Sequence, residues 1–446
     1  MGVSTSIGVV HEDALSAPVA REEPVFGRRN LVIAAVLFVA ALLALFILQA
    51  IFHIQSTGVS NAPHYLYQAE SFLHGRWDLD LKPTFTDVVL INGKSYIVYP
   101  PFPALLLLPF VAVFGLATSD VLFTTVMAAL NLPLLFLLFE QVRRNGLTQR
   151  RWAENVLIAA LCYFGSINLW LSLGGRMWFT AQVVCCAFTL LALLAGFRQR
   201  YAWSAALLGC AFFSRATVLF IYPFLFYLAW QGSDHLFERF VVSLRARAPD
   251  WAAIPWRRLA PIAAVSAGVV LLFFIRNTLI FGSPLNSGYD ILIQQHYSVV
   301  TTGAFNVRHI PVNIVANFFD FPRITLNGPF DRHPTIDMLN GGEGVSVFFT
   351  TPLFLLLFWR NRIFSMTRAA LWVVLGLVVM MVLLFHAAGY FEFGARYLYD
   401  GYPVAFLLLA LNDEPADWRF VALGMLGIGI NLLGAHQFWT NHIIHL

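Results

Sequence analysis

The chain has 446 residues, of which 59% are hydrophobic and only 12% are charged, and its mean hydropathy is +0.71. About a quarter of the residues in a soluble globular protein are charged, so this composition argues against a soluble enzyme and predicts a protein of the bilayer. The net charge of +4 forms no basic patch, and the sequence has no glycine-rich phosphate cradle. We therefore expect no nucleic-acid or nucleotide partner.

The first 30 residues are polar and end in Arg28-Arg29, and the apolar run that follows begins at Leu31. A cleavable signal peptide starts basic and turns apolar within a few residues, which is not the pattern here. The run lasts about 22 residues, long enough to cross the roughly 30 Å hydrocarbon core. We predict a disordered cytoplasmic tail over residues 1–30, followed by a transmembrane domain over residues 31–446 that opens with a permanent first span.

Apolar runs recur along the rest of the chain and predict an all-α polytopic membrane protein with about eleven spans. The runs are Leu31–His53, Val121–Glu140, Asn155–Leu171, Trp178–Leu194, Ala202–Phe213, Thr217–Trp230, Leu259–Arg276, Val345–Phe358, Ala369–Phe385, Tyr402–Leu411 and Phe420–Phe438. The four cysteines all lie inside these runs, so we interpret them as small buried apolar residues and not as disulfide or metal ligands.

The arginines decide whether the proline-led run Pro101–Phe114 is a further span. It has about 14 residues, a length typical of re-entrant or interfacial segments. If it does not cross, the amino terminus and most of the 28 lysines and arginines are cytoplasmic; if it crosses, nearly every later basic loop moves outside. We predict that it does not cross, and that two long loops, 54–120 and 277–344, face the non-cytoplasmic side.

The first outer loop is expected to combine an interfacial helix over Ala62–Leu73 with a hairpin around an Asn92-Gly93 turn, paired through Val88–Leu90 and Tyr96–Tyr99. The basic Lys94 in this hairpin is a candidate substrate-binding residue. Carboxylates cluster nearby at the membrane surface. They are Glu70, Asp78, Asp80 and Asp87. A solvated loop face is one interpretation of this cluster, and an essential carboxylate is the other.

The second outer loop carries histidines and aspartates, but none has the spacing of a metal cage. We expect a mobile lid that binds an acceptor or a lipid. Within it, Asn313–Phe321 is expected to form an interfacial helix that places aromatic side chains among the headgroups.

Four segments carry a resemblance to a known superfamily. They read PHYLYQAESFLHGRWDLDL…INGKSYIVYPPFPALLLLPFVAVFG, LLGCAFFSRATVLFIYP, RNTLIFGSPLNSGYD and FGARYLYDGYP. Over most of Leu31–Leu411 the chain resembles bacterial members of the GT-C superfamily of membrane glycosyltransferases, and within it a poorly characterised subgroup. The superfamily includes the protein O-mannosyltransferases and the aminoarabinose transferases that modify lipid A.

The resemblance implies a GT-C-like bundle in the bacterial inner membrane. It also implies a sugar transferred on the non-cytoplasmic face from a polyprenyl-phosphate donor to an envelope glycan, lipid or protein. The superfamily usually has an acidic general base just after the first span, where this sequence has Ser60-Asn61-Ala62. A neutral Asn61 cannot accept the proton. The next carboxylates are Glu70, Asp78 and Asp80, and we rank them as catalytic candidates in that order.

A departing lipid phosphate needs fixed positive charge at the outer interface. Arg215, which separates two short apolar runs, is the first candidate, Arg396-Tyr397 is the second and Arg176 the third. The structural alternatives are an Arg215 that reaches the outer headgroups and an Arg396–Asp400 pair that caps a span.

No cofactor is implied beyond the lipid-linked sugar itself, and a divalent cation is left open. A second hypothesis is a non-catalytic binder or transporter of lipid-linked cargo on the same scaffold, which the missing acid at Asn61 favours. Charges confined to the outer side disfavour transport, which needs charge along a path through the membrane. A structural subunit of an envelope complex is a third reading.

Overall fold

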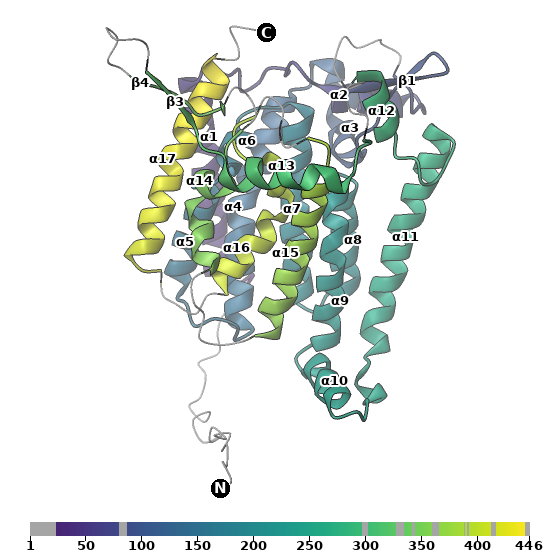
Figure 1. Cartoon of the computed structure of the whole chain (residues 1–446), viewed down its shortest axis with the longest axis vertical. Coiled ribbons are helices and arrows are strands. Elements are labelled where there is room, and N and C mark those ends of the chain that lie inside the picture. The colour runs from purple at the N-terminus through teal and green to yellow at the C-terminus, as the bar shows by residue number, and fades with distance from the viewer. Residues whose placement is uncertain are drawn as a thin grey trace.

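The computed structural model describes residues 24–79, 87–296, 302–326, 334–340, 344–358, 365–387, 389, 392–411 and 416–441. Long helices stand side by side, and two small hairpins and several short helices gather at one end (Figure 1). The prediction of an all-α polytopic membrane protein is confirmed.

The elements follow one another in this order. The first half contains α1 (Arg28–Ile51), α2 (His64–Leu73), β1 (Val88–Ile91), β2 (Lys94–Ile97), α3 (Phe102–Phe114), α4 (Asp120–Arg144), α5 (Trp152–Phe164), α6 (Asn168–Leu171), α7 (Met177–Phe197), α8 (Tyr201–Phe212), the 3₁₀ helix η3 (Ala216–Ile221) and α9 (Tyr222–Gln231). The second half contains α10 (Leu236–Arg245), α11 (Trp256–Phe281), α12 (Tyr289–His296), α13 (Ile310–Ile314), the π-helix η6 (Val315–Phe319), β3 (Arg323–Leu326) and β4 (Pro334–Asp337). It ends with α14 (Val347–Thr350), the 3₁₀ helix η8 (Pro352–Phe358), α15 (Met366–Leu384), the 3₁₀ helix η9 (Arg396–Gly401), α16 (Tyr402–Ala410) and α17 (Trp418–Asn441).

Within the described part of the chain, six helices are long and apolar enough to cross a membrane, namely α1, α4, α7, α11, α15 and α17. A seventh is reached if α10 is joined to the preceding helical stretch Ala216–Gln231, from which it bends by 91°. The other apolar runs that the sequence predicted as spans form shorter helices, such as α5, α6 and α16. The first span begins at Arg28, three residues before the apolar run, and residues 1–23 lie outside the described residues.

The basic loops gather at one end of the bundle, which we call the basic end. Asn145, just after α4, donates its side-chain amide to the carbonyl of Phe197 at the end of α7, at 2.9 Å. Arg198 lies over the ring of Phe26, just before α1, at 4.4 Å. The start of α1 and the ends of α4 and α7 therefore share one end. Further contacts there join Arg29 to Trp152, Arg150 to the Leu409 and Ala410 carbonyls, and Arg368 to the Leu411 carbonyl.

The opposite end, which we call the loop end, holds the loop that follows α1. Ser60 donates its backbone N–H and its hydroxyl to Asp120, at the start of α4, at 2.8 and 2.6 Å. The chain thus leaves α1 and enters α4 at the same end. Between them, α3 has 13 residues, or about 20 Å at 1.5 Å per residue, which is too short for the hydrocarbon core. The prediction that Pro101–Phe114 does not cross is confirmed.

The predicted first hairpin is confirmed as well. Strands β1 and β2 pair antiparallel with Val88 opposite Ile97, and the turn residues Asn92 and Gly93 both have positive φ, as a tight two-residue turn requires. A second hairpin, β3–β4, has no counterpart in the sequence predictions. The expected interfacial helix over Asn313–Phe321 is found as α13 and η6, which lie across the helices of the bundle (Figure 1).

Helix α7 is the central helix. In α7, 83% of the most apolar window is buried inside the protein, compared with 17% in α1 and in α11. Helices α1 and α11 therefore present most of their surface to lipid, whereas α7 is enclosed by protein. Any group that the first turns of α7 hold at the loop end is therefore attached to a helix that protein encloses on most sides.

The arginine distribution predicts that the loop end is non-cytoplasmic, and cysteine labelling tests this orientation. Leu285, after α11, is 81% exposed, and Ala248, after α10, is exposed at the basic end. We expect a membrane-impermeant maleimide to label Leu285→Cys in intact cells, and Ala248→Cys only after the membrane is permeabilised. The unsubstituted chain is the control, since three of its four cysteines are buried and Cys210 is half-buried within α8. The reverse labelling pattern would invert the topology.

Candidate functional site

The first two turns of α7 tie both parts of the loop end together. The Met177 N–H donates to the Ala62 carbonyl at 3.1 Å, and the Trp178 indole donates to the Asp87 carboxylate at 3.0 Å. One turn later, the Gln182 amide donates to the Arg396 carbonyl at 2.6 Å. Segments that are distant in the sequence therefore meet around one helix end, and the side chains between them form the candidate site.

The Arg215 guanidinium is bound by a buried carboxylate. Its Nε lies 3.0 Å from Asp400, whose side chain is fully buried, and the Thr217 hydroxyl also donates to Asp400. Burial alone would lower the pKa of Arg215, but the Asp400 carboxylate more than reverses this and holds the pKa above its ordinary value. Arg215 is thus a permanent cation with one carboxylate as counter-ion.

Arg396 has a different counter-ion from the one considered in the sequence. Its Nε lies 2.5 Å from Glu392, and both side chains are buried. The Arg396–Asp400 pair does not form because Asp400 faces Arg215. Burial lowers the pKa of Arg396, but the Glu392 carboxylate raises it again, above its ordinary value.

Tyr397 lies between the two guanidinium groups. Arg396 is 4.9 Å from the centre of the Tyr397 ring and Arg215 is 5.9 Å from it, both within cation–π range. Burial raises the pKa of the Tyr397 phenol. The phenol therefore stays neutral and is a hydrogen-bond donor beside two cations.

Asp87 is the loop carboxylate that this structure brings into the site. It is 4% exposed and accepts hydrogen bonds from the Tyr99 phenol at 3.1 Å and from Trp178. Its φ of 69° is a left-handed conformation, which aspartate adopts more readily than most residues. Sequence analysis placed Asp87 in the loop cluster without giving it a role. The register of the hairpin could have indicated this position. Val88 pairs with Ile97, so the next residues outward, Asp87 and Val98, lie opposite each other, and Tyr99 follows.

Arg276, near the end of α11, is a buried cation without a carboxylate partner among the described residues. It is 4% exposed, and its guanidinium donates to the carbonyls of Val98 and Tyr99 at 2.8 and 3.1 Å. Its Nε and the buried Tyr65 hydroxyl have no hydrogen-bond partner in the part of the chain that the structure describes. Sequence analysis assigned it only to the end of a span. A buried cation that only neutral groups surround attracts an anion.

Tyr289, on α12, connects these groups electrostatically. Burial raises its pKa to about 12, and three nearby charges act on it: Arg215 and Arg276 lower the pKa, and Asp87 raises it. Its ring also contacts the ring of Tyr99, with 6.2 Å between their centres. The second outer loop therefore covers the site with a neutral phenol.

A cavity of about 310 Å³ opens beside Asn61. Its lining residues are His53, Ile54, Gln55, Val59, Ser60, Asn61, Val121, Gly174, Gly175, Arg176 and Trp439. A Cβ added at Gly174 would overlap the Trp439 ring, and one added at Gly175 would overlap the backbone of α4, so bare main chain forms this wall. Although Asn61 is neutral, the preceding residue, Ser60, is hydrogen-bonded to the carboxylate of Asp120, to which sequence analysis gave no role.

Arg176 is the predicted residue that reaches the cavity. Its guanidinium lies 5.4 and 5.3 Å from the centres of the Phe438 and Trp439 rings. Burial, helped by the charge of Arg396, lowers the pKa of Arg176 to about 10, which still leaves it cationic at neutral pH. The structure therefore brings together Arg176, Arg215, Arg396 and Tyr397.

The carboxylates that the sequence ranked highest lie elsewhere. The Glu70 side chain is 36% exposed and faces His74 at 3.8 Å, and Asp78 pairs with the exposed Lys94 at 3.3 Å. Asp80 lies outside the described residues. Across the described ranges, no group of three or more His, Cys, Asp or Glu side chains is placed to hold a metal ion.

Comparisons with known proteins add one distant likeness. No protein-family model matches the chain, and no curated protein matches it. Among solved structures, it is similar to the crystal structure of ArnT from Cupriavidus metallidurans bound to undecaprenyl phosphate, with 16% identity and a TM-score of 0.47. The match covers 88% of this chain and 62% of the ArnT chain, so this chain spans less than two thirds of the length of ArnT.

The Arg215–Asp400 pair is expected to matter for stability. Replacing Asp400 by Asn leaves a buried cation without its counter-ion, which typically costs about 3–5 kcal/mol. We expect Asp400→Asn to lower the apparent Tm of the purified protein, and the double variant with Arg215→Gln to lose less than the two single variants together. Asp234→Asn, which breaks the more exposed pair with Arg258, is the matched control. An Asp400→Asn protein as stable as this control would contradict the assignment.

Proposed function

We propose that the chain is a membrane glycosyltransferase that moves a sugar from a polyprenyl-phosphate donor to an envelope glycan, lipid or protein. The reaction is placed at the loop end, on the non-cytoplasmic face of a bacterial inner membrane. In it, the acceptor hydroxyl loses its proton to a carboxylate, its oxygen bonds to the sugar carbon, and polyprenyl phosphate departs with the electrons of the broken carbon–oxygen bond.

The observation that carries this proposal is the set of buried guanidinium groups at the loop end. Arg215 and Arg396 each face one carboxylate, whereas Arg276 faces only neutral acceptors and Arg176 faces aromatic rings. The set as a whole can accept an anion. Guanidinium forks suit phosphate oxygens, and their low-dielectric surroundings strengthen the stabilisation of the charge that develops on the leaving phosphate.

Asp87 is our proposal for the general base. It lies among these groups, whereas Glu70 faces the exposed His74 and Asp78 pairs with the exposed Lys94. Tyr99 and Trp178 fix the orientation of the carboxylate, and a positioned base contributes about 10²–10⁴-fold to a rate. The sequence-ranked candidates Glu70, Asp78 and Asp80 remain the alternative.

The assay for both proposals uses radiolabelled polyprenyl-phosphate sugar with membranes that contain the chain. We expect Asp87→Asn to reduce transfer to the acceptor by about 100-fold or more while expression, folding and insertion are retained. Asp417→Asn, just before α17 and paired with Arg419, is the matched control and keeps its activity. If Asp87→Asn retains transfer while Glu70→Gln, Asp78→Asn or Asp80→Asn loses it, the base is one of the sequence-ranked residues. If all four retain transfer, the base lies elsewhere.

The phosphate assignment predicts the behaviour of a different set of variants. We expect Arg276→Gln to weaken the binding of polyprenyl phosphate to the purified protein by about tenfold or more, because a hydrogen bond to a charged group is lost. Arg215→Gln and Arg396→Gln are expected to act in the same direction. Arg308→Gln, at an exposed position of the second outer loop, is the control. Unchanged affinity in all three site variants would place the phosphate elsewhere.

A non-catalytic binder of lipid-linked cargo is the second candidate function. The neutral Asn61 favours it, and so does the presence of a counter-ion at Arg215 and at Arg396. The same radiolabel separates the two functions. Label that moves to an acceptor means an enzyme, whereas label that stays on the bound donor means a binder.

A further inference from the structure

A second functional surface lies at the basic end, where the chain passes from α9 to α11. We call residues Gln231–Arg258 the platform. Its helix, α10, bends by 91° from the helical stretch that ends at Gln231, so it runs along the membrane plane and not through it. In Figure 1, α10 lies across the lower ends of α9 and α11.

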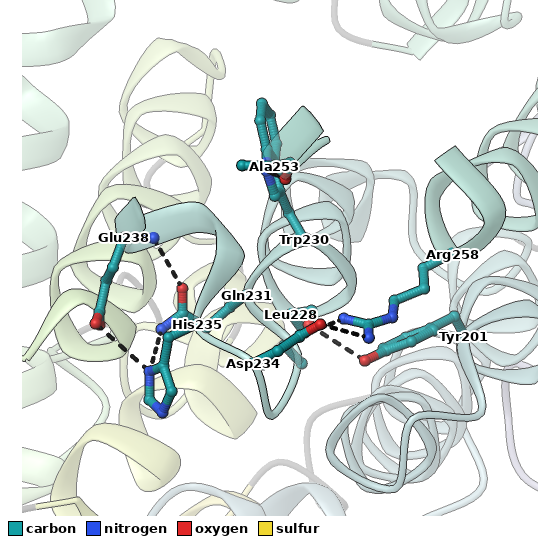
Figure 2. A network of polar contacts seen from close by, with 9 residues as sticks. All are labelled: Tyr201, Leu228, Trp230, Gln231, Asp234, His235, Glu238, Ala253 and Arg258. Atoms are coloured by element: carbon teal, nitrogen blue, oxygen red, sulfur yellow. Dashed lines mark hydrogen bonds and ion pairs between the residues drawn. The ribbon is translucent and has the colours of Figure 1, made fainter. Parts of the chain in front are cut away.

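A network of polar contacts fixes the platform in this orientation (Figure 2). Arg258 at the start of α11 makes two hydrogen bonds to Asp234, at 2.7 and 2.9 Å. Gln231 accepts from the backbone N–H of Glu238 at 3.2 Å and contacts the His235 ring at 2.9 Å. The Trp230 indole donates to the Ala253 carbonyl at 2.9 Å. Both ends of the platform are thus held to the spans.

Every acidic residue of the platform already faces a basic residue of the platform. Asp234 pairs with Arg258, Asp250 pairs with Arg239 at 2.7 Å, and Glu238 faces His235 at 3.5 Å. The remaining arginines have no ion pair or side-chain hydrogen bond to any described residue, and all three are exposed. They are Arg245, Arg247 and Arg257. The platform therefore presents cationic groups that the protein itself does not neutralise.

Large apolar side chains are exposed on the same segment. Val242, Leu244, Trp251 and Trp256 are 64%, 48%, 66% and 68% exposed. Trp256 is also the first residue of α11, so it marks the level at which a lipid-facing span begins. Exposed tryptophan at a span end is typical of the headgroup layer, and an in-plane helix with apolar and cationic side chains is typical of an interfacial helix.

We propose that the platform is a binding site for anionic phospholipids of the leaflet at the basic end. The exposed tryptophans enter the headgroup layer, and Arg245, Arg247 and Arg257 bind the phosphates of lipids with net negative charge. Aqueous solvent alone would leave the apolar side chains unburied. A nucleic acid would need the cations away from the membrane, whereas Trp256 holds this surface at it. The inference does not depend on the proposed glycosyltransferase activity.

The site links to the rest of the molecule through two helices. Helix α9 continues the turn that carries Arg215, and α11 carries Arg276 at its other end. A lipid bound to the platform therefore fixes the ends of the two helices that lead to the candidate phosphate-binding residues.

The test measures lipid binding to the full chain by native mass spectrometry, with phosphatidylglycerol and phosphatidylcholine compared at equal concentration. We expect a preference for phosphatidylglycerol. It should fall by about 100-fold in the triple variant Arg245→Gln, Arg247→Gln, Arg257→Gln, since each cation near an anionic surface contributes about fivefold. Arg308→Gln, an exposed arginine at the loop end, is the matched control and keeps the preference.

Two results would overturn the proposal. One is a triple variant that retains the preference for phosphatidylglycerol, and the other is inorganic phosphate that competes with the lipid at millimolar concentration, which would indicate a free-anion site. Circular dichroism and elution volume check the fold of the triple variant. If it misfolds, Arg247→Gln alone replaces it, with an expected loss of about fivefold.

Discussion

Charge inside a water-free bundle needs a partner from the protein, and this constraint organises the loop end. Arg215 is held by Asp400 and Arg396 by Glu392, while Arg276 binds the backbone carbonyls at the end of β2. The partnerships of Arg215 and Arg276 join segments that the chain order separates, whereas Arg396 and Glu392 are four residues apart. The charges that suit the site for chemistry are therefore also the contacts that assemble it, and a substitution at one of them changes both function and stability.

Helix α7 supplies the frame on which those pairs are arranged. It is enclosed by protein along most of its length, and its first turns hold Ala62, Asp87 and the carbonyl of Arg396. The loop carboxylate and the two arginines beside Tyr397 therefore share one rigid reference. Side chains that are placed in this way keep a fixed geometry. In enzymes, such preorganised charges are the main source of electrostatic stabilisation.

The sequence was sufficient for the features that follow from local pattern. Long apolar runs predicted α1, α4, α7, α11, α15 and α17, the arginine bias indicated that α3 does not cross, and Asn92-Gly93 predicted the first hairpin. The pairing of charges could not be predicted from the sequence. Arg215 and Asp400 are 185 positions apart, and no periodicity relates them. Arg396 has a carboxylate four positions away on each side, Glu392 and Asp400, and the sequence does not decide between them. The structure shows that the buried Glu392 is the partner. Asp87 was visible as a loop carboxylate, but its burial depends on Trp178, 91 positions away.

The wall of backbone at Gly174 and Gly175 has a consequence for how such a cavity can diversify. Neither position has room for a side chain, because the Trp439 ring and the start of α4 fill the space. A change of cavity shape along this wall would therefore require moving a span or replacing the Trp439 ring. The rest of the lining, which includes the stretch from His53 to Asn61 after a lipid-facing helix, carries side chains whose substitution changes the cavity without moving a span.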